Sequence, residues 1–393
     1  MLNTPFSPWP SFSSEEADAV RDVILSNKVN YWTGQHCREF EKEFAAWAET
    51  RYAVALTNGT VALDLALKAL EVGDGDEVVV ASRTFLASAS SIVNARAVPI
   101  FADIDPDSQA ITAESIAAVL TSRTRAIVCV HLAGWPCEMD PIMALAKEHQ
   151  LFVIEDCAQA HGALYKGRPV GSIGHIGAWS FCQDKIMTTG GEGGMVTTND
   201  AELWSKMWSF KDHGKSWEAV YERDHAPGFR WLHDSFGTNW RMLEVQAAIG
   251  RIQLKRMQEW QAARIKNANR IWEQARLLNG LRVPVIPEHI RHAAYKCYVF
   301  VEPTKLKPDW NRDRIQTEVS ARGVPCYSGS CSEVYLEKAF DDTGWRPEQR
   351  LPAAKELGET SLMFLVHPTL EPQEIERTCY VLAEVMALAT ADQ

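Results

Sequence analysis

The 393-residue sequence predicts an α/β protein in which a largely parallel sheet, flanked by helices, is followed by a smaller α+β domain. Short and almost entirely apolar runs recur before residue 250, as expected of strands that are buried on both faces. Stretches with helical spacing separate these runs, and that alternation is typical of a parallel sheet. The chain is also too long for one ordinary hydrophobic core, which favours two domains.

The expected strands are the four apolar runs at residues 77–81, 98–103, 126–130 and 151–154. Helical patterns precede them at residues 13–25, 37–49 and 60–70. The first of these helices opens with capping residues, and the third ends at Gly73-Asp74-Gly75-Asp76. Because ligands of such sheets gather at the carboxyl ends of the strands, the residues that follow each run are the first candidates for a site.

The sequence pattern changes in the second half of the chain. The helical or strand-like segments there are residues 241–278, 296–301, 312–322 and 372–389. A strand-like run between long helices, followed by an irregular stretch, is typical of an α+β arrangement. We therefore expect a large α/β domain at residues 1–255 and a small α+β domain at residues 256–393.

Composition argues against several classes of protein. The net charge of −11 disfavours nucleic-acid binding, which requires a basic face, but a nucleotide-linked small substrate would fit a local cationic pocket. Nine cysteines without a CxxC pair indicate reduced thiols in a cytoplasmic protein, and we expect no metal site. We also expect no signal peptide and no membrane partner, because no basic leader and no membrane-length apolar stretch is present.

Lys185 has the most specific sequence surroundings in the chain. It lies between Ser180-Phe181 and the glycine-rich turn at residues 190–194. Such a lysine is either a solvated charge or the amine that holds an aldehyde cofactor as a Schiff base. Asp156 follows the apolar run at residues 151–154, where a carboxylate would face the active edge of the sheet. A pyridoxal-phosphate site requires both groups, an acid for the pyridinium nitrogen and an amine for the aldehyde.

Three further features fit the same cofactor, although each also has an ordinary structural explanation. Thr57-Asn58-Gly59-Thr60 stands directly before a helical pattern, where backbone N–H groups bind phosphate, but it is equally an N-cap turn. The Ser180 hydroxyl is a second candidate for hydrogen-bonding phosphate. Phe85 follows the run at residues 77–81 and is either a stacking partner for a flat ring or a core residue.

Together these segments resemble the DegT-type sugar aminotransferases, which are pyridoxal-phosphate enzymes with the aspartate aminotransferase fold (fold type I). The resemblance covers nearly the whole chain and rests on seven segments in the order of the family. They are residues 58–63, 73–78, 84–88, 103–105, 155–162, 180–194 and 239–242. The resemblance implies a mostly parallel, seven-stranded-type sheet flanked by helices in the large domain, with pyridoxal 5′-phosphate as the cofactor.

By this resemblance the two catalytic residues are Lys185, the Schiff-base lysine, and Asp156, the partner of the pyridinium nitrogen. Gln159 is then expected beside the cofactor ring and its phenolic oxygen, and Phe85 is expected to stack on one face of the ring.

The resemblance also assigns the phosphate contacts to Gly59, Thr60 and Ser180. Asn239 resembles the family's asparagine that reaches the phosphate of the neighbouring subunit's cofactor. A homodimer with shared active sites is therefore implied.

The implied reaction is amino transfer by a ping-pong mechanism. Lys185 would move the proton between the substrate carbon and the cofactor, first as a base and then as an acid. The expected donor is glutamate, and the expected acceptor is a nucleotide-linked keto-deoxysugar, with a 4-keto-6-deoxy sugar favoured. The product would serve surface polysaccharide, such as lipopolysaccharide O-antigen, or related amino-sugar biosynthesis. Some relatives carry histidine in place of the lysine and remove a hydroxyl group, so Lys185 favours transamination.

Alternative functions stay open at this point. A 3-keto-sugar nucleotide or a keto-cyclitol would require the same chemistry as the 4-keto sugar. A catalytically inactive regulator that binds the cofactor is disfavoured by the intact pair of Lys185 and Asp156. The chain also shows no added helix-turn-helix region, since features of the family begin near residue 15.

The candidate substrate residues are Trp32, Lys215, Arg230, Tyr327 and Ser328. Lys215 and Arg230 belong to a stretch rich in cationic and aromatic side chains, which would contact a pyrophosphate and base or form a solvated loop. Trp32 would line the sugar pocket or pack in the core. Tyr327 and Ser328 stand where many relatives have a His-Tyr-type segment, and a polar loop is the alternative.

Overall fold

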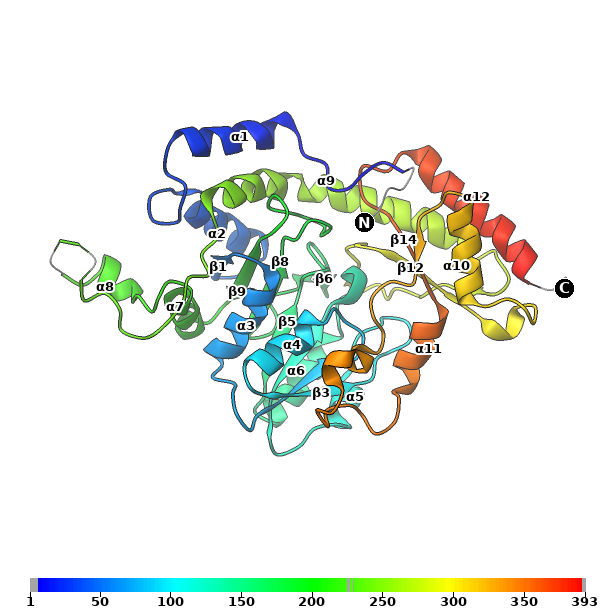
Figure 1. Cartoon of the computed structure of the whole chain (residues 1–393), viewed down its shortest axis with the longest axis horizontal. Helices are drawn as coiled ribbons and strands as arrows, with labels where there is room; N and C mark the ends of the chain where they lie inside the picture. The colour runs from blue at the N-terminus through cyan, green and yellow to red at the C-terminus, as the bar shows by residue number, and fades with distance from the viewer. Residues whose placement is uncertain (1–5, 225–226, 229, 391–393) are drawn as a thin grey trace.

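The computed structural model describes residues 6–224, 227–228 and 230–390, and a seven-stranded sheet forms the centre of its larger part (Figure 1). Across the sheet the strands are β1 (Tyr52–Leu56), β9 (Gly194–Thr198), β8 (Ile176–Ser180), β5 (Phe152–Asp156), β4 (Thr124–Val130), β2 (Glu77–Ala81) and β3 (Val98–Ala102). β9 is antiparallel to both of its neighbours, and the remaining pairs are parallel. The expected mostly parallel seven-stranded sheet is confirmed.

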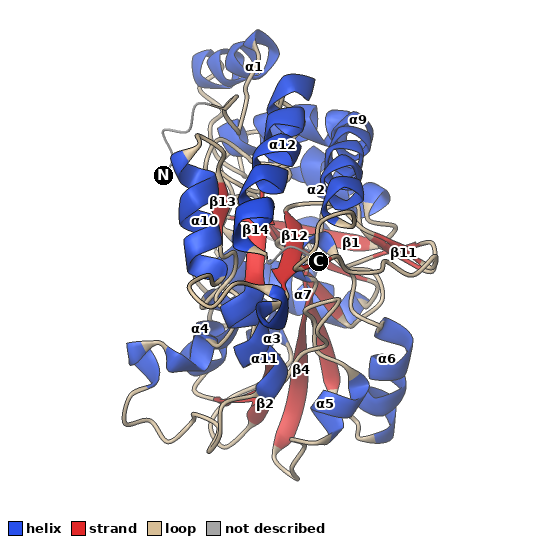
Figure 2. Cartoon of the chain, turned by 90° about the vertical axis from the view of Figure 1, so that its right-hand side faces the viewer, coloured by secondary structure: helices blue, strands red, loops and turns tan. Residues whose placement is uncertain are grey.

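Helices cover both faces of this sheet, which explains the unbroken apolar runs in the sequence. β2, β8 and β9 are buried at every position. In Figure 2, α4 (Ala87–Asn94) and α6 (Met139–Glu148) lie on opposite sides of β2 and β4. The other helices of this part are α2 (His36–Trp47), α3 (Gly59–Ala69), α5 (Ala113–Ala117) and α7 (Ala201–Phe210).

A 32-residue helix, α9 (Glu244–Ala275), connects the two parts of the molecule (Figure 1). α1 (Ser14–Leu25) and α2 pack against it, and so do α12 (Pro372–Ala389) and β12 (Cys297–Val301). The domain boundary expected at residue 256 falls inside this helix and stays a prediction.

The C-terminal part is built on a four-stranded antiparallel sheet, in the order β10 (Leu281–Arg282), β12, β14 (Ser361–Phe364) and β13 (Cys326–Tyr327). α10 (Arg312–Ala321), α11 (Pro352–Thr360) and α12 complete it. Apolar side chains of α9, β12, β14 and α12 form a hydrophobic cluster separate from that of the larger sheet. The smaller α+β unit is thus confirmed.

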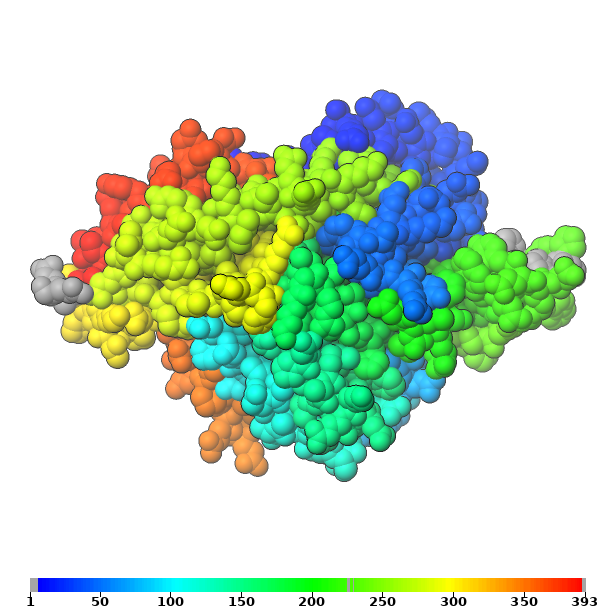
Figure 3. Space-filling model, turned by 180° about the vertical axis from the view of Figure 1, so that it is seen from behind, coloured from blue at the N-terminus to red at the C-terminus, as the bar shows by residue number. Residues whose placement is uncertain are grey.

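Short elements connect these layers. They are β6 (Leu164–Tyr165), β7 (Arg168–Pro169) and β11 (Ile290–Arg291), which form a third sheet, the helix α8 (Trp217–Tyr221), and the 3₁₀ turns η1 (Leu132–Gly134), η2 (Pro303–Lys305), η3 (Val334–Leu336) and η4 (Lys338–Phe340). The segment that carries α8 projects from the body of the molecule (Figure 3). All nine cysteines are free thiols, as expected. Among the described residues, no helix has the length and apolar character needed to cross a membrane.

Candidate active site

A cavity of about 580 Å³ opens beside Lys185, at the carboxyl ends of the parallel strands. The larger part of the molecule contributes Phe85 and Gln159 to its walls, and the C-terminal part contributes Tyr327 and Lys296. Phe85 is 70% exposed, so it is not the core residue that its alternative interpretation required. The structure therefore brings four of the sequence-predicted site residues to one pocket, since Lys185 lines the same cavity.

The main chain of Lys185 is held at both of its polar groups. Its N–H donates to the carbonyl of Cys182 at 3.1 Å. Its carbonyl accepts a hydrogen bond of 2.9 Å from the indole N–H of Trp9, a residue far away in the sequence. The side chain is half-buried, and its Nζ lies 5.3 Å from the centre of the Tyr295 ring. A fixed backbone with a side chain that reaches into a cavity suits an amine that must meet a bound ligand.

Asp156 is the last residue of β5 and is almost completely buried. Its Oδ2 accepts a hydrogen bond of 2.7 Å from the hydroxyl of Ser88, and its Oδ1 accepts one of 3.1 Å from the backbone N–H of Ala158. β5 is paired with strands on both sides, which fixes the carboxylate at the edge of the sheet. The carboxylate is therefore oriented by neutral donors only, and no cation of the described chain forms an ion pair with it.

Gln159 is oriented from the turn η1. Its Oε1 accepts a hydrogen bond of 2.9 Å from the backbone N–H of Ala133, and the side chain is buried at the wall of the cavity. This bond determines which way the amide faces. The amide nitrogen is then the donor that Gln159 offers to a ligand.

The start of α3 forms a close junction with the end of β8. Asn58 is the N-cap of this helix and accepts from the backbone N–H of Val61 at 3.0 Å. A Cβ atom on Gly59 would stand 2.4 Å from the Cβ of Ser180 and 2.8 Å from its Oγ, so only glycine fits here. The first backbone N–H groups of the helix, at Gly59 and Thr60, thus lie beside the Ser180 hydroxyl. This arrangement fits the phosphate of the expected cofactor.

Two of the predicted substrate residues, and Asn239, belong to a different part of the chain. Lys215 Nζ lies 4.4 Å from the centre of the Trp32 ring and 2.9 Å from Asp212 Oδ1. Arg241 Nη1 reaches the same oxygen at 2.6 Å, and the backbones of Asp212 and Asn239 form a bridge. We call these five residues the Asp212 cluster. None of them lines the Lys185 cavity of the same chain.

The Asp212 cluster nevertheless lies close to the turn at residues 57–60, where the phosphate contacts are expected. The backbone N–H of Thr57 donates to the carbonyl of Trp240 at 3.1 Å, and Asn239, which directly precedes Trp240, is exposed. Lys215 is 7% exposed, which does not match its alternative interpretation as a solvated loop residue. Arg230 and Ser328 are both exposed, outside the walls of the Lys185 cavity.

Three charged residues near Lys185 had no recognisable sequence signal. They are Asp184, Arg264 and Lys296. Tyr295 contacts the first of them, because its hydroxyl donates a hydrogen bond to the Asp184 carboxylate. Burial raises the pKa of Asp184, but Lys185 and the Tyr295 hydroxyl outweigh it, so this pKa is lowered. Burial, aided by Arg264 and Lys185, lowers the pKa of Lys296 to about 8 against the opposing effect of Asp184. These groups come from distant segments, and only the fold brings them together.

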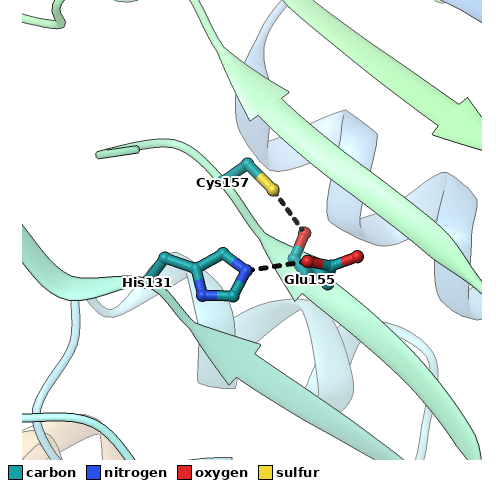
Figure 4. A group of neighbouring side chains, drawn as sticks. All are labelled: His131, Glu155 and Cys157. Atoms are coloured by element: carbon teal, nitrogen blue, oxygen red, sulfur yellow. Dashed lines mark hydrogen bonds and ion pairs between the residues drawn. The ribbon is translucent and has the colours of Figure 1, made fainter. Parts of the chain in front are cut away.

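A buried network lies next to Asp156, on the residues that flank it (Figure 4). Glu155 Oε2 accepts from His131 Nε2 at 2.9 Å and from the backbone N–H of Gly171 at 2.8 Å. Its Oε1 accepts from the backbone N–H groups of residues 173 and 174. Burial raises the pKa of Glu155, but the bonds from His131 and the backbone outweigh it and lower the pKa.

The ligand atoms of His131, Glu155 and Cys157 all lie within 4.8 Å of one another, a spacing that would suit a metal ion. Both carboxylate oxygens of Glu155 are already used by four donors, however. His131 Nδ1 accepts from the backbone N–H of Cys137 at 3.0 Å, and burial raises the pKa of the Cys157 thiol to about 12. We therefore assign this group to the support of β5 and of the loop at residues 171–174.

Comparisons with known proteins agree with this geometry. The model of the DegT/DnrJ/EryC1/StrS aminotransferase family matches residues 10–383. The GDP-perosamine synthase of Caulobacter vibrioides is 36% identical over 375 residues, which cover 93% of this chain and 95% of that protein. The UDP-N-acetyl-3-dehydro-alpha-D-glucosamine 3-aminotransferase of Acidithiobacillus ferrooxidans is 34% identical, with 93% and 95% covered.

Solved structures give the same result. The aminotransferase from Psychrobacter cryohalolentis is 65% identical and superimposes with a TM-score of 0.96, over 98% of this chain and 99% of that chain. The S. venezuelae DesV structure in complex with a ketimine intermediate is 31% identical, with a TM-score of 0.85 over 95% of this chain and 94% of that chain.

Proposed function

The chain belongs to the DegT/DnrJ/EryC1/StrS aminotransferase family, and we propose that it transfers the amino group of glutamate to a nucleotide-linked 4-keto-6-deoxy sugar. It is a sugar aminotransferase that depends on pyridoxal phosphate. The observation that carries the proposal is the cavity in which the Lys185 amine, Gln159 and Phe85 meet at the carboxyl ends of the strands. The relatives named for GDP-linked and UDP-linked sugars support a nucleotide-linked acceptor.

We assign the proton transfers to Lys185. The bound cofactor supplies an electron sink that makes the substrate carbon acidic. Lys185 would hold the cofactor as its amine partner, and the same amine, once free, would take the proton from the substrate carbon as a base and give it back as an acid. The half-buried side chain on a fixed backbone suits both tasks, because the amine needs to move by only a short distance.

We assign the control of the cofactor ring to Asp156, Gln159 and Phe85. The Asp156 carboxylate, oriented by Ser88 and the backbone N–H of Ala158, would keep the ring nitrogen protonated. Gln159 would donate from its amide nitrogen to the phenolic oxygen, and Phe85 would cover one face of the ring. Gly59, Thr60 and Ser180 would hold the phosphate, because their N–H and hydroxyl groups meet at the start of α3.

We further propose a homodimer in which Asn239 reaches the phosphate of the partner's cofactor. Its exposed position beside the phosphate-binding turn and the projecting segment around α8 support this proposal (Figure 1). In that segment Trp231 is 83% exposed and Phe236 is 98% exposed, which is unusual for aromatic side chains without a partner surface. Trp32, Lys215, Arg230, Tyr327 and Ser328 would then contact the sugar nucleotide from two chains.

Free and mostly buried thiols are typical of proteins in reducing compartments, so we propose a cytoplasmic enzyme. Its product would enter surface polysaccharide, such as O-antigen, or related amino-sugar biosynthesis.

The test of the proposed function is a pair of half-reactions on the purified holoenzyme. Glutamate should remove the long-wavelength absorbance of the lysine-bound cofactor, and one member of a keto-sugar nucleotide panel should restore it. The panel includes GDP-, UDP- and dTDP-linked 4-keto-6-deoxy sugars, 3-keto sugars and a free keto-cyclitol. Mass spectrometry then identifies the aminated product. If glutamate has no effect and Lys185→Ala behaves as the wild type, the protein is a regulator and the proposal fails.

A further inference from the structure

We propose that Lys296, supported by Arg264, binds a carboxylate of the amino donor beside Lys185. This inference rests on the proposed function, since it names the residues that select an acidic donor. Lys296 lines the same cavity as Lys185. Its Nζ lies 4.7 Å from the centre of the Tyr295 ring, and Lys185 Nζ lies 5.3 Å from that centre. The two nitrogens are therefore within about 10 Å of each other, the sum of these two distances.

The positive charge around this ring has little compensation. In the described part of the chain, Lys185, Lys296 and Arg264 form no ion pair with a carboxylate. Asp184 is the acidic group that acts on Lys296 and Arg264, and its carboxylate already accepts the Tyr295 hydroxyl. With three cations and one anion, the group carries a net positive charge. Lys185 is assigned to the cofactor, so Lys296 and Arg264 remain for another ligand.

Arg264 gives a second, independent sign of a missing ligand. It is 1% exposed, and its Nη1 donates to the carbonyl of Tyr295 at 3.4 Å. Its Nε and Nη2 are buried without a hydrogen-bond partner among the described residues. The Trp9 ring lies 4.9 Å from the guanidinium and covers part of its surface. Buried donors without acceptors are costly, and Arg264 contacts Tyr295, which lines the cavity, so a negative charge bound beside Lys296 would offset part of that cost.

The pKa values of both residues agree with a site that favours an anion. Burial lowers the pKa of Arg264 to about 9, and burial, together with Arg264 and Lys185, lowers that of Lys296 to about 8. Arg264 thus disfavours the charged form of Lys296. A bound carboxylate would raise both pKa values again.

The chemistry of the reaction favours a donor carboxylate over the diphosphate of the acceptor. The α-carboxylate of an amino acid is bonded to the carbon whose proton Lys185 removes, so it must lie close to Lys185. The diphosphate is separated from the reacting keto carbon by the sugar ring. Lys296 and Lys185 lie near the same Tyr295 ring. The α-carboxylate is nearer to the reacting carbon than the diphosphate is, so the α-carboxylate is the expected ligand of Lys296.

The experiment measures binding without turnover. Isothermal titration calorimetry on the holoenzyme uses glutarate, a dicarboxylate that has no amino group and cannot react. GDP, UDP and dTDP are titrated in parallel. Lys296→Met should weaken glutarate binding by roughly 10- to 100-fold, as expected for the loss of a charge-assisted hydrogen bond, and leave the nucleotides unchanged. Lys296→Arg should retain most of the affinity.

Two further variants complete the design. Arg264→Lys tests the supporting cation, and Lys266→Gln, an exposed position on the same helix, is the matched control for removal of one charge. Unchanged glutarate binding in Lys296→Met overturns the inference, and so does a loss of affinity confined to the nucleotides. The proposed function is judged separately, by the absorbance response of the wild type to glutamate. A wild type that binds glutarate through Lys296 but ignores glutamate would contradict the proposed function and support the anion site.

Discussion

The Lys185 pocket and the Asp212 cluster are both rich in cations, but only in the Asp212 cluster do the cations form ion pairs with a carboxylate of the described chain. In the Asp212 cluster a single buried carboxylate oxygen accepts from both Lys215 and Arg241, and the Lys215 ammonium also lies over the Trp32 ring. In the Lys185 pocket, Lys185 and Lys296 have no carboxylate within ion-pair distance among the described residues, although they lie near the same ring.

This difference distinguishes cations whose ion pairs stabilise the fold from cations that are expected to bind a ligand. A buried ion pair repays its desolvation only when its partners are well placed, and Asp212 provides that placement within one chain. The cations around Lys185 have only the shared influence of Asp184, so a ligand must supply the remaining negative charge. A substrate role for Lys215 would accordingly require the substrate to compete with Asp212.

The largest expected effect is that of Lys185→Ala on catalysis. Loss of both the anchoring amine and the base should lower the rate of the glutamate half-reaction by at least about 10⁴-fold. The long-wavelength absorbance of the lysine-bound cofactor should also disappear. Stopped-flow spectroscopy measures both, with Lys266→Ala on the exposed face of α9 as the control. A variant that kept more than a few per cent of the activity would contradict the roles proposed for Lys185.

Asp156→Asn is expected to have the next largest effect. It preserves the size of the side chain but removes the charge that the ring nitrogen requires, so kcat should fall by roughly 10²-fold. Ser88→Ala removes only the hydrogen bond that orients Oδ2 and should cost much less. Equal losses in the two variants would show that orientation, and not charge, is the contribution of Asp156.

Stability provides the most direct test of the two kinds of charge. Asp212→Asn removes the carboxylate that the buried Lys215 and the partly buried Arg241 share, and the free energy of unfolding should fall by about 3 kcal/mol. Lys296→Met removes a half-buried ammonium that has no ion-pair partner among the described residues, so it should leave the stability unchanged or increase it. Urea titrations of both variants measure the difference. A stability loss in Lys296→Met as large as that in Asp212→Asn would show that the two kinds of cation contribute to stability in the same way.

The sequence predicted the residues of the Lys185 pocket much better than the contacts of the Asp212 cluster. Asp156 and Gln159 lie at or just beyond the end of an apolar run, and Gly59 and Thr60 begin a helix, so local patterns were enough to suggest them. The Asp212 cluster depends on contacts between residues 32, 212–215 and 239–241, which no local periodicity reports. Lys215 was proposed from its neighbours, but its pairing with Asp212 was not foreseen.

The fold shows the same limit. The strands at β2 and β12 and the final helix α12 were predicted nearly to the residue, because their patterns are strong. β1, β8 and β9 were not predicted. β8 (Ile176–Ser180) begins Ile-Gly-Ala, and β9 (Gly194–Thr198) follows the glycine-rich turn, so glycine weakens the apolar signal of both. Their place in the sheet is determined by pairing with distant strands, which also positions Ser180 against Gly59.

The pH dependence of glutamate binding should reveal the charge of the Lys296 ammonium. The pKa of Lys296 is about 8, so the ammonium that binds the carboxylate is present below pH 8 and is lost above it. The KM for glutamate should rise above this pH, by up to about tenfold per unit. The charged groups around Lys296 are Asp184, Arg264 and Lys185, while burial lowers the pKa of the nearby His367 to about 3 and keeps it neutral.

The matched measurement is the same profile in Lys296→Arg, whose guanidinium stays charged and should flatten the rise. Folding should show the opposite trend. Because this pKa is lowered from 10.5, the cost of burying the Lys296 ammonium is present in full below pH 8 and disappears as the pH rises toward 10.5. A glutamate KM that is flat from pH 7 to 9 in the wild type would contradict the role given to Lys296.

The smallest expected effect concerns the indole of Trp9, which links the first residues of the described chain to Lys185. Its N–H donates to the Lys185 carbonyl, and its ring packs on Trp260 and near the Arg264 guanidinium. Trp9→Phe retains most of the packing and removes one neutral hydrogen bond, worth about 1 kcal/mol. We expect kcat to fall several-fold with little change in the KM for glutamate, because the lysine main chain is loosened and the cations remain. If the KM changes instead, Trp9 acts through Arg264, and its contribution belongs to the anion site.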